Sequence, residues 1–226
     1  MSSYGVPNSG DDLVVADVSK APRLSVGPNL HLPNRGNVWA LDHYGVLAEL
    51  VHVKYSQVDL NNHSGGIFLK SAAAPFIYKP KKTVELNGMA AAVRLHDVAP
   101  TFYIRGLIDD DSESESNSSA VATKTTLYLV RLEVKADRRV AATIAFTQLT
   151  GKASRSQDVI EIVTSKVSGS DWYRVVPKLP LAPGEYGLMR MPKGQNLFGV
   201  NIYDFAVDPN ALENGGAMKS DADTVP

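Results

Sequence analysis

The sequence predicts an all-β protein built as a β-sandwich, in which antiparallel sheets enclose a common core. Short runs of alternating apolar and polar residues recur along the chain between clusters of turn residues. Asn87-Gly88 separates two such runs, which is a strong hairpin signal because both residues accept positive φ. No stretch shows a convincing amphipathic-helix pattern, so we expect strands throughout.

Composition limits the classes of function. The chain has 226 residues, of which 44% are hydrophobic and 21% charged, so it can bury a substantial core. Its 23 basic and 24 acidic side chains give a net charge of -1, which creates no field that attracts nucleic acid. The lack of cysteine excludes disulfides and thiolate chemistry. No signal peptide is visible and no apolar run approaches the roughly 20 residues that span a bilayer, so we predict no membrane span.

Residues 1–35 are predicted to form an extended, proline-rich N-terminal arm, because four prolines disfavour helix there. Within the arm, LVVADV (13–18) is β-prone and is expected to pair with a sheet edge, its own or a neighbour's. The prolines are Pro7, Pro22, Pro28 and Pro33.

Residues 36–98 are predicted to form a small N-terminal β region. In ELVHVKY (49–55), Val51, Val53 and Tyr55 share one face of a strand, and polar residues take the other. The sequence leaves open whether this region folds independently or shares a core with the residues that follow. Its further predicted strands are 66–70, 75–79, 83–87 and 89–95.

Residues 99–208 carry the predicted sandwich. In LYLVRLEVK (127–135), Val130, Leu132 and Val134 alternate with charged residues, which is typical of a strand with one buried and one solvated face. The other predicted strands are 101–105, 140–148, 158–164, 172–176, 185–190 and 201–207.

Two polar segments belong to no predicted strand. Residues 109–119 combine acidic residues with serines and carry no apolar side chain, which predicts a mobile loop. Weak calcium binding is the alternative for this loop, although the ligand order of a calcium loop is missing. Residues 209–226 are predicted to be a disordered tail.

The stretch LPLAPGEYGL (179–188) predicts a structural corner. Pro183 and Gly184 turn the chain, and Tyr186 begins a strand. A tyrosine at such a turn in a Greek-key sandwich sends its hydroxyl to an upstream backbone group. A catalytic role for Glu185 or Tyr186 needs an acid or base partner, and none stands at useful spacing. A phosphate loop needs more glycines and a following helix.

Around this corner the chain resembles an uncharacterised group of bacterial envelope or secreted β-sandwich proteins. The resemblance rests on LAPGEYGL, MPKGQNLFG and IYDFAVD within 181–208, on LVRLEVKADRRVA (129–141) and on PTFYIRG (100–106). It implies an immunoglobulin-like fold for the C-terminal sandwich and an extracytoplasmic location in the periplasm, at the cell surface or outside the cell. The group has no established catalytic residues, so none is carried over.

The sequence contains no recognisable catalytic, cofactor or metal motif. The five histidines form no metal-type pair, and no G-x-S-x-G nucleophile occurs. Asp42-His43 and His96-Asp97 are adjacent pairs, but neighbours on a strand point to opposite faces and rarely act together. We therefore predict no catalytic residue, no cofactor and no metal site, and a zinc site assembled from histidines distant in the sequence is the less favoured alternative.

Trp172 and Tyr173 are possible ligand contacts, because sugars stack on exposed aromatic rings. The alternative is that these neighbours face opposite ways, with one ring in the core. An aromatic content of only 8% favours this alternative.

Three functions fit these observations. The first is a non-enzymatic envelope or extracellular module that binds itself or another envelope protein, with the arm completing a neighbour's sheet. The second is a domain that binds a glycan or small ligand through loops at one end of the sandwich. The third, and least favoured, is an enzyme with a dispersed site.

Overall fold

The computed structural model describes residues 24–62, 81–106, 125–146, 153–156, 158–192 and 201–220. Within these ranges every regular element is a β-strand, and the strands pair antiparallel except where β8 contacts β18. The all-β prediction is therefore confirmed for this part of the chain, in which no helix is long and apolar enough to cross a membrane. Run 13–18, the predicted strands 66–70 and 75–79, and the loop 109–119 lie outside the described residues.

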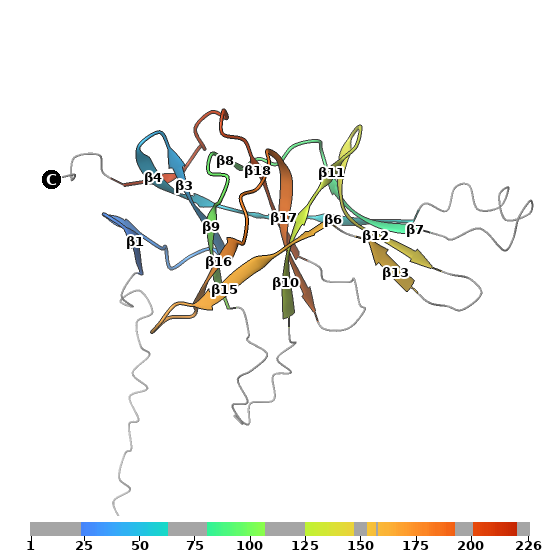
Figure 1. Cartoon of the computed structure of the whole chain (residues 1–226), viewed down its shortest axis with the longest axis horizontal. Coiled ribbons are helices and arrows are strands. Elements are labelled where there is room, and N and C mark those ends of the chain that lie inside the picture. Colours follow the sequence, from blue (N-terminus) through green and yellow to red (C-terminus); the bar gives the residue numbers. More distant parts are fainter. Residues whose placement is uncertain are drawn as a thin grey trace, which may run out of the picture.

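Three sheets follow one another along the long axis of the molecule, with one sheet between the other two (Figure 1). We call this one the central sheet. Its strands, in order, are β14 (Asp158–Ile160), β10 (Thr125–Arg131), β17 (Gly184–Pro192), β18 (Asn201–Val207) and β5 (Tyr55–Ser56), with β8 (Arg94–Leu95) beside β18.

The outer two sheets are named after their main strand pairs. The β3–β4 sheet contains β15 (Ile162–Lys166), β16 (Trp172–Pro177), β9 (Thr101–Arg105), β3 (Val38–Tyr44), β4 (Leu47–His52) and β19 (Met218–Lys219). The β7–β12 sheet contains β11 (Glu133–Val134), β12 (Arg138–Phe146), β7 (Lys81–Asn87) and β6 (Val58–Asn62), with β13 (Ala153–Ser156) beside β12. A separate hairpin consists of β1 (Ser25–Gly27) and β2 (Leu30–His31).

The central sheet is buried on both faces, because each face packs against another sheet. Phe205 of the central sheet meets Phe102 of the β3–β4 sheet with ring centroids 4.8 Å apart, in the larger core. On the opposite face, Val130 and Ile202 pack against Val84 of the β7–β12 sheet. Successive side chains of β10 therefore point into two different cores. The prediction that one face of this strand is solvated is wrong for Leu129, which is fully buried.

The chain changes sheets within three predicted strands. Run 49–55 breaks after His52, where β4 of the β3–β4 sheet gives way to β5 of the central sheet. Run 127–135 breaks at Leu132, where β10 of the central sheet gives way to β11 of the β7–β12 sheet. Run 158–164 breaks at Glu161, where β14 of the central sheet gives way to β15 of the β3–β4 sheet. These changes tie neighbouring sheets together covalently.

Residues 36–98 and 99–208 do not form separate units, which settles the open question about the N-terminal region. Strand β3 pairs with β9, and β7 pairs with β12, so strands from both ranges share sheets and cores.

The arm prediction for 1–35 is also corrected at its end. Leu30 and Leu32 are buried against the outer face of the β3–β4 sheet.

The disordered-tail prediction for 209–226 is wrong for residues 209–220. Strand β19 lengthens the β3–β4 sheet by pairing with β4, and Ser220 N donates to Ala48 O. Asn214 is buried and hydrogen-bonded to groups more than one hundred residues away in the chain. The composition of this segment predicted disorder because the segment has no apolar run. A few specific polar contacts order it instead.

Candidate functional site

The predicted corner has the geometry of a tyrosine corner. The Tyr186 hydroxyl donates to Ala182 O at 2.5 Å, and its ring is 1% exposed. Arg131 caps the corner, because its guanidinium lies over the Tyr186 ring and donates to Pro183 O at 3.2 Å. Gly184 has φ +154°, a conformation that other residues rarely adopt, and a Cβ there would also lie 2.9 Å from Arg131 Nη2. Burial raises the pKa of Tyr186, so the phenol stays a donor. This corner is structural.

Trp172 and Tyr173 are both buried, so neither ring offers an open face to a sugar. Trp172 is 3% exposed and packs on the outer face of the β3–β4 sheet, with Arg105 stacked 5.0 Å from its ring. Tyr173 is 5% exposed and lies in the larger core between the sheets. The two rings do face opposite ways, but both faces of this strand are covered.

A buried arginine on β12 joins the central sheet to the β7–β12 sheet. Arg139 Nη1 lies 2.6 Å from Asp204 Oδ2 and 3.2 Å from Glu185 Oε2. Its remaining donors reach the carbonyls of Gly88 and Asn87. Because Arg139 is 3% exposed, these four acceptors must satisfy it.

The glutamate of the PGEY corner belongs to this network. Glu185 Oε2 also accepts from Ala91 N at 2.8 Å, and Arg94 Nη1 lies 3.7 Å from Oε1. Arg94 in turn donates to Asp208 at 2.9 Å, and this hydrogen bond lowers the pKa of Asp208. Glu185 therefore holds the segment after β7 in place, and sequence analysis missed this role because its partners are distant in sequence.

A pocket of about 610 Å³ opens where the chain passes from β4 to β5, and we call it the basic pocket. Its volume lies within the range of sites that bind small molecules. Four segments and two single residues contribute to it, so it depends on the whole fold. They are Arg35, Gly36, Trp39, Val51, His52, Lys54, Ser56, Ala90, Ala92, Val93, Arg139, Asp204, Asn214, Gly215 and Gly216.

The rim of the basic pocket carries two exposed cations, Arg35 and Lys54. No ion pair joins either side chain to a carboxylate in the described ranges. Burial, followed by the charges of Lys54 and Arg35, lowers the pKa of His52. At the floor, Arg139 and Asp204 neutralise each other.

One wall of the basic pocket is an aromatic stack with fixed geometry. The rings of His52 and Trp39 lie 4.7 Å apart at an interplanar angle of 27°. Trp39 Nε1 donates to Arg35 O at 3.0 Å, which locks the indole. Gly36 has φ +80° and a Cβ there would lie 2.6 Å from His52 Nε2, so the loop closes tightly on the imidazole.

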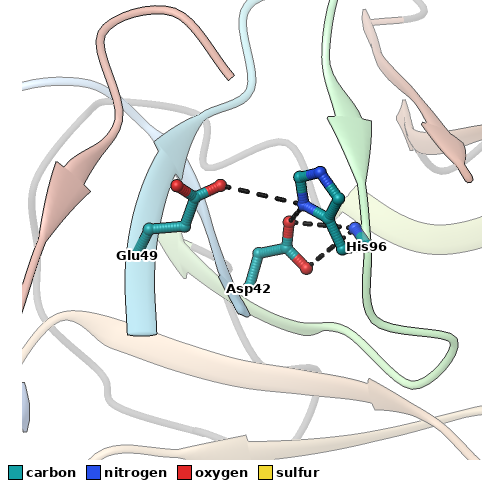
Figure 2. Close-up of side chains that lie close together, drawn as sticks. All are labelled: Asp42, Glu49 and His96. Carbon is teal, nitrogen blue, oxygen red and sulfur yellow. Dashed lines mark hydrogen bonds and ion pairs between the residues drawn. The ribbon is translucent and has the colours of Figure 1, made fainter. Parts of the chain in front are cut away.

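A second cluster lies at the end of the larger core (Figure 2). Asp42 of β3 and Glu49 of β4 are directly opposite each other, and both are fully buried. Asp42 accepts the backbone N–H groups of His96 and Asp97 and lies 2.8 Å from His96 Nδ1. His96 Nε2 lies 3.3 Å from Ala211 O. Both imidazole nitrogens thus face oxygen acceptors, which favours the imidazolium.

The pKa directions in this cluster follow its contacts. Burial opposes the charged form of His96, but the hydrogen bond and charge of Asp42, with the Ala211 carbonyl, outweigh it and raise the pKa. Burial raises the pKa of Glu49 despite a hydrogen bond from Asn214, and the charge of Asp42 adds to the increase.

The sequence pairs Asp42-His43 and His96-Asp97 contact each other, and each histidine lies against the aspartate of the other pair. Asp42 pairs with His96 in the interior, while His43 Nδ1 lies 2.7 Å from Asp97 Oδ2 at the surface. Neighbours within each pair do point apart, as expected, but the two pairs face each other. Asp42 follows Val38 and Ala40 at steps of two residues along β3, so all three side chains point to the same, buried face. This spacing in the sequence could have predicted that the Asp42 carboxylate points inward.

Comparison of the chain with protein-family models, with curated protein sequences and with solved structures finds no match.

Proposed function

We propose that this protein is a non-enzymatic binding module that holds a small anionic ligand in the basic pocket. The observation that carries the proposal is the pairing of charges. Arg139 at the floor is already compensated by Asp204 and Glu185, whereas Arg35 and Lys54 at the rim pair with no carboxylate among the residues that the structure describes. A carboxylate or phosphate between the two rim cations gives them the partner that the described chain does not provide.

The lining of the basic pocket supports a ligand with an apolar part as well as an anionic group. Val51 and Val93 reach the basic pocket from the larger core, and the exposed Ala90 and Ala92 add further apolar surface. Pockets of this volume that combine apolar surface with convergent polar groups are a usual form of small-molecule sites. Among the functions that the sequence left open, this geometry favours small-ligand binding. The ligand then contacts the lining of the basic pocket and not Trp172, which the sequence had suggested.

Calorimetric titration with a panel of small carboxylates, inorganic phosphate and phosphate monoesters tests the proposal. We expect one or more members to bind at one site, and the double variant Arg35→Gln/Lys54→Gln to weaken that binding at least tenfold. Lys135→Gln removes one surface charge in the turn between β11 and β12, outside the basic pocket, and serves as a control for a general effect of lost surface charge. Equal affinity in the two variants, or no binding across the panel, would overturn the proposal.

We further infer that the central and β3–β4 sheets form an immunoglobulin-like sandwich. Support comes from the tyrosine corner at Tyr186, the shared core of the two antiparallel sheets and the chain that switches sheets at Glu161. The extracytoplasmic location and the self-assembly of this module stay predictions. The assembly hypothesis depends on the arm segment 1–23, which lies outside the described residues.

A further inference from the structure

We propose that Asp42, Glu49 and His96 bind one divalent transition-metal ion through two carboxylates and one imidazole nitrogen. The site is distinct from the basic pocket and does not depend on the function proposed for it. The three side chains come from β3, from β4 and from the segment after β8 (Figure 2). One ligand atom from each lies within 4.8 Å of the others, close enough for small rotamer shifts to surround one ion.

The imidazole of His96 is oriented as a metal-ligating histidine. Its Nε2 lies 3.3 Å from Ala211 O, so this nitrogen carries the hydrogen and donates to the carbonyl. That contact fixes the ring and leaves Nδ1 facing Asp42 Oδ2 at 2.8 Å and Glu49 Oε1 at 4.0 Å. Histidines that bind metal commonly donate their other ring N–H to a backbone carbonyl in this way.

Glu49 supplies an independent observation that points to a ligand. Its side chain is 0% exposed, and Oε2 has no hydrogen-bond partner among the residues that the structure describes. A buried carboxylate oxygen without a partner is unfavourable, and native structures rarely keep one. Glu49 Oε1, which faces His96 Nδ1, accepts only a long hydrogen bond from Asn214 at 3.3 Å, so a cation bound at Oε1 gives this buried carboxylate a close counter-charge.

The ligand set determines the class of ion. One nitrogen and two carboxylate oxygens, without sulfur, suit Zn²⁺ and similar divalent ions. Binding replaces the proton on His96 Nδ1, which leaves to solvent as the metal–nitrogen bond forms. Three protein ligands leave a coordination position for water, and the bound ion ties β3 and β4 to the segment after β8 that carries His96.

The experiment uses untagged full-length protein stripped of metal by a chelator. Zn²⁺ retention after dialysis is measured by elemental analysis, and Co²⁺ is titrated as a spectroscopic probe, because its visible bands report nitrogen and oxygen ligands. The variants are His96→Gln and Glu49→Gln. His43→Gln is the matched control, because His43 also faces an aspartate at 2.7 Å but lies at the surface.

We expect one Zn²⁺ per wild-type chain, a visible Co²⁺ spectrum, and at least tenfold weaker binding in both cluster variants, with His43→Gln unchanged. If the cluster variants misfold, the stoichiometry and the Co²⁺ spectrum of the wild type and of His43→Gln still test the proposal. Substoichiometric Zn²⁺ together with a Co²⁺ spectrum of the free aqueous ion in the wild type overturns the proposal. Loss of binding in His43→Gln equal to that in His96→Gln does so too.

Discussion

Arg139 of β12 and Asp204 of β18 form a 2.6 Å ion pair across the contact between two sheets. Both side chains are more than nine-tenths buried, and Glu185 completes the group on the same face of the central sheet. The pair is buried at the floor of the basic pocket, next to the apolar core between the two sheets, so water screens these charges less than it screens surface charges. The network fixes how the β7–β12 sheet sits on the central sheet.

Replacing Arg139 with methionine should destabilise the protein strongly. The substitution keeps volume but leaves the carboxylates of Asp204 and Glu185 buried without a cation. Removing one partner of such a pair costs about 3–5 kcal/mol in the free energy of unfolding. Chemical denaturation followed by circular dichroism measures the change.

A triple variant separates the two possible causes of that loss. Arg139→Met/Glu185→Gln/Asp204→Asn removes the uncompensated charges together with the cation. If unpaired charge causes the loss, the triple variant should be more stable than Arg139→Met alone. A triple variant that is no more stable than the single variant would instead assign the loss to the hydrogen bonds from Arg139 to Gly88 and Asn87.

Local patterns predicted the corner and many of the described strands. The predicted strand 89–95 is wrong except at Arg94–Leu95, and the hairpin predicted at Asn87-Gly88 is wrong because β7 pairs with β6 and β12. The alternation in 49–55 places Val51 and Val53 in the core, and the turn at Pro183-Gly184 leads into the buried Tyr186. These features depend on residues close in sequence, where chain geometry alone sets the side-chain directions. The position of the central sheet between two others was not predicted, because its strands read locally as half-solvated.

The sites were not predicted because they are assembled over long sequence separations. Arg139 meets Glu185 and Asp204 across 46 and 65 residues, and His96 meets Asp42 across 54. A single sequence carries no signal for such pairings. The basic pocket is harder still to predict, because its rim depends on which cations lack partners once the sheets have packed.

Tyr186→Phe should lower the free energy of unfolding while leaving the fold intact. The ring stays in the core, but Ala182 O loses the 2.5 Å hydrogen bond and Arg131 loses an acceptor at 3.4 Å. One buried hydrogen bond of this kind contributes about 1 kcal/mol. Urea denaturation measures the change, with Tyr55→Phe as control because Tyr55 is 51% exposed. Equal effects of the two substitutions would argue against a stabilising role for the corner.

Anion binding in the basic pocket should strengthen as the pH falls through the range in which His52 titrates. Burial, then Lys54 and Arg35, hold the pKa of His52 below its ordinary 6.5 in the free protein. A bound anion favours the imidazolium, so binding takes up a proton and affinity rises by at most about tenfold per pH unit. Calorimetry from pH 8 to pH 5 with a sulfonate, which does not titrate there, measures this slope.

The controls follow from the same linkage. His52→Gln should abolish the slope, whereas His31→Gln, which lies on β2 outside the pocket, should keep it. In the free protein, the stability that depends on His52 changes with pH in the direction opposite to anion affinity. Because the folded pKa is the lower one, the His52 contribution to stability is complete above 6.5 and is lost as the pH falls. A slope that persists in His52→Gln would assign the proton uptake to another group.

Asn214→Ala should release the C-terminal segment from the β3–β4 sheet. Its amide nitrogen donates to Arg94 O at 2.7 Å and to Glu49 Oε1 at 3.3 Å, and its oxygen accepts from Arg94 N at 3.0 Å. Alanine leaves these buried groups unpaired, which costs about 1–3 kcal/mol for each unsatisfied group.

Hydrogen exchange distinguishes the anchoring role of Asn214 from that of β19 itself. If Asn214 is the anchor, the amides of 218–220 should exchange much faster in Asn214→Ala, while those of β9 and β17 stay protected. Leu212→Ala is the control, because this side chain in the same segment is 88% exposed. Unchanged exchange in Asn214→Ala would mean that the ladder between β19 and β4 holds the segment without help. Faster exchange would mean that one buried amide orders a stretch whose composition alone predicts disorder.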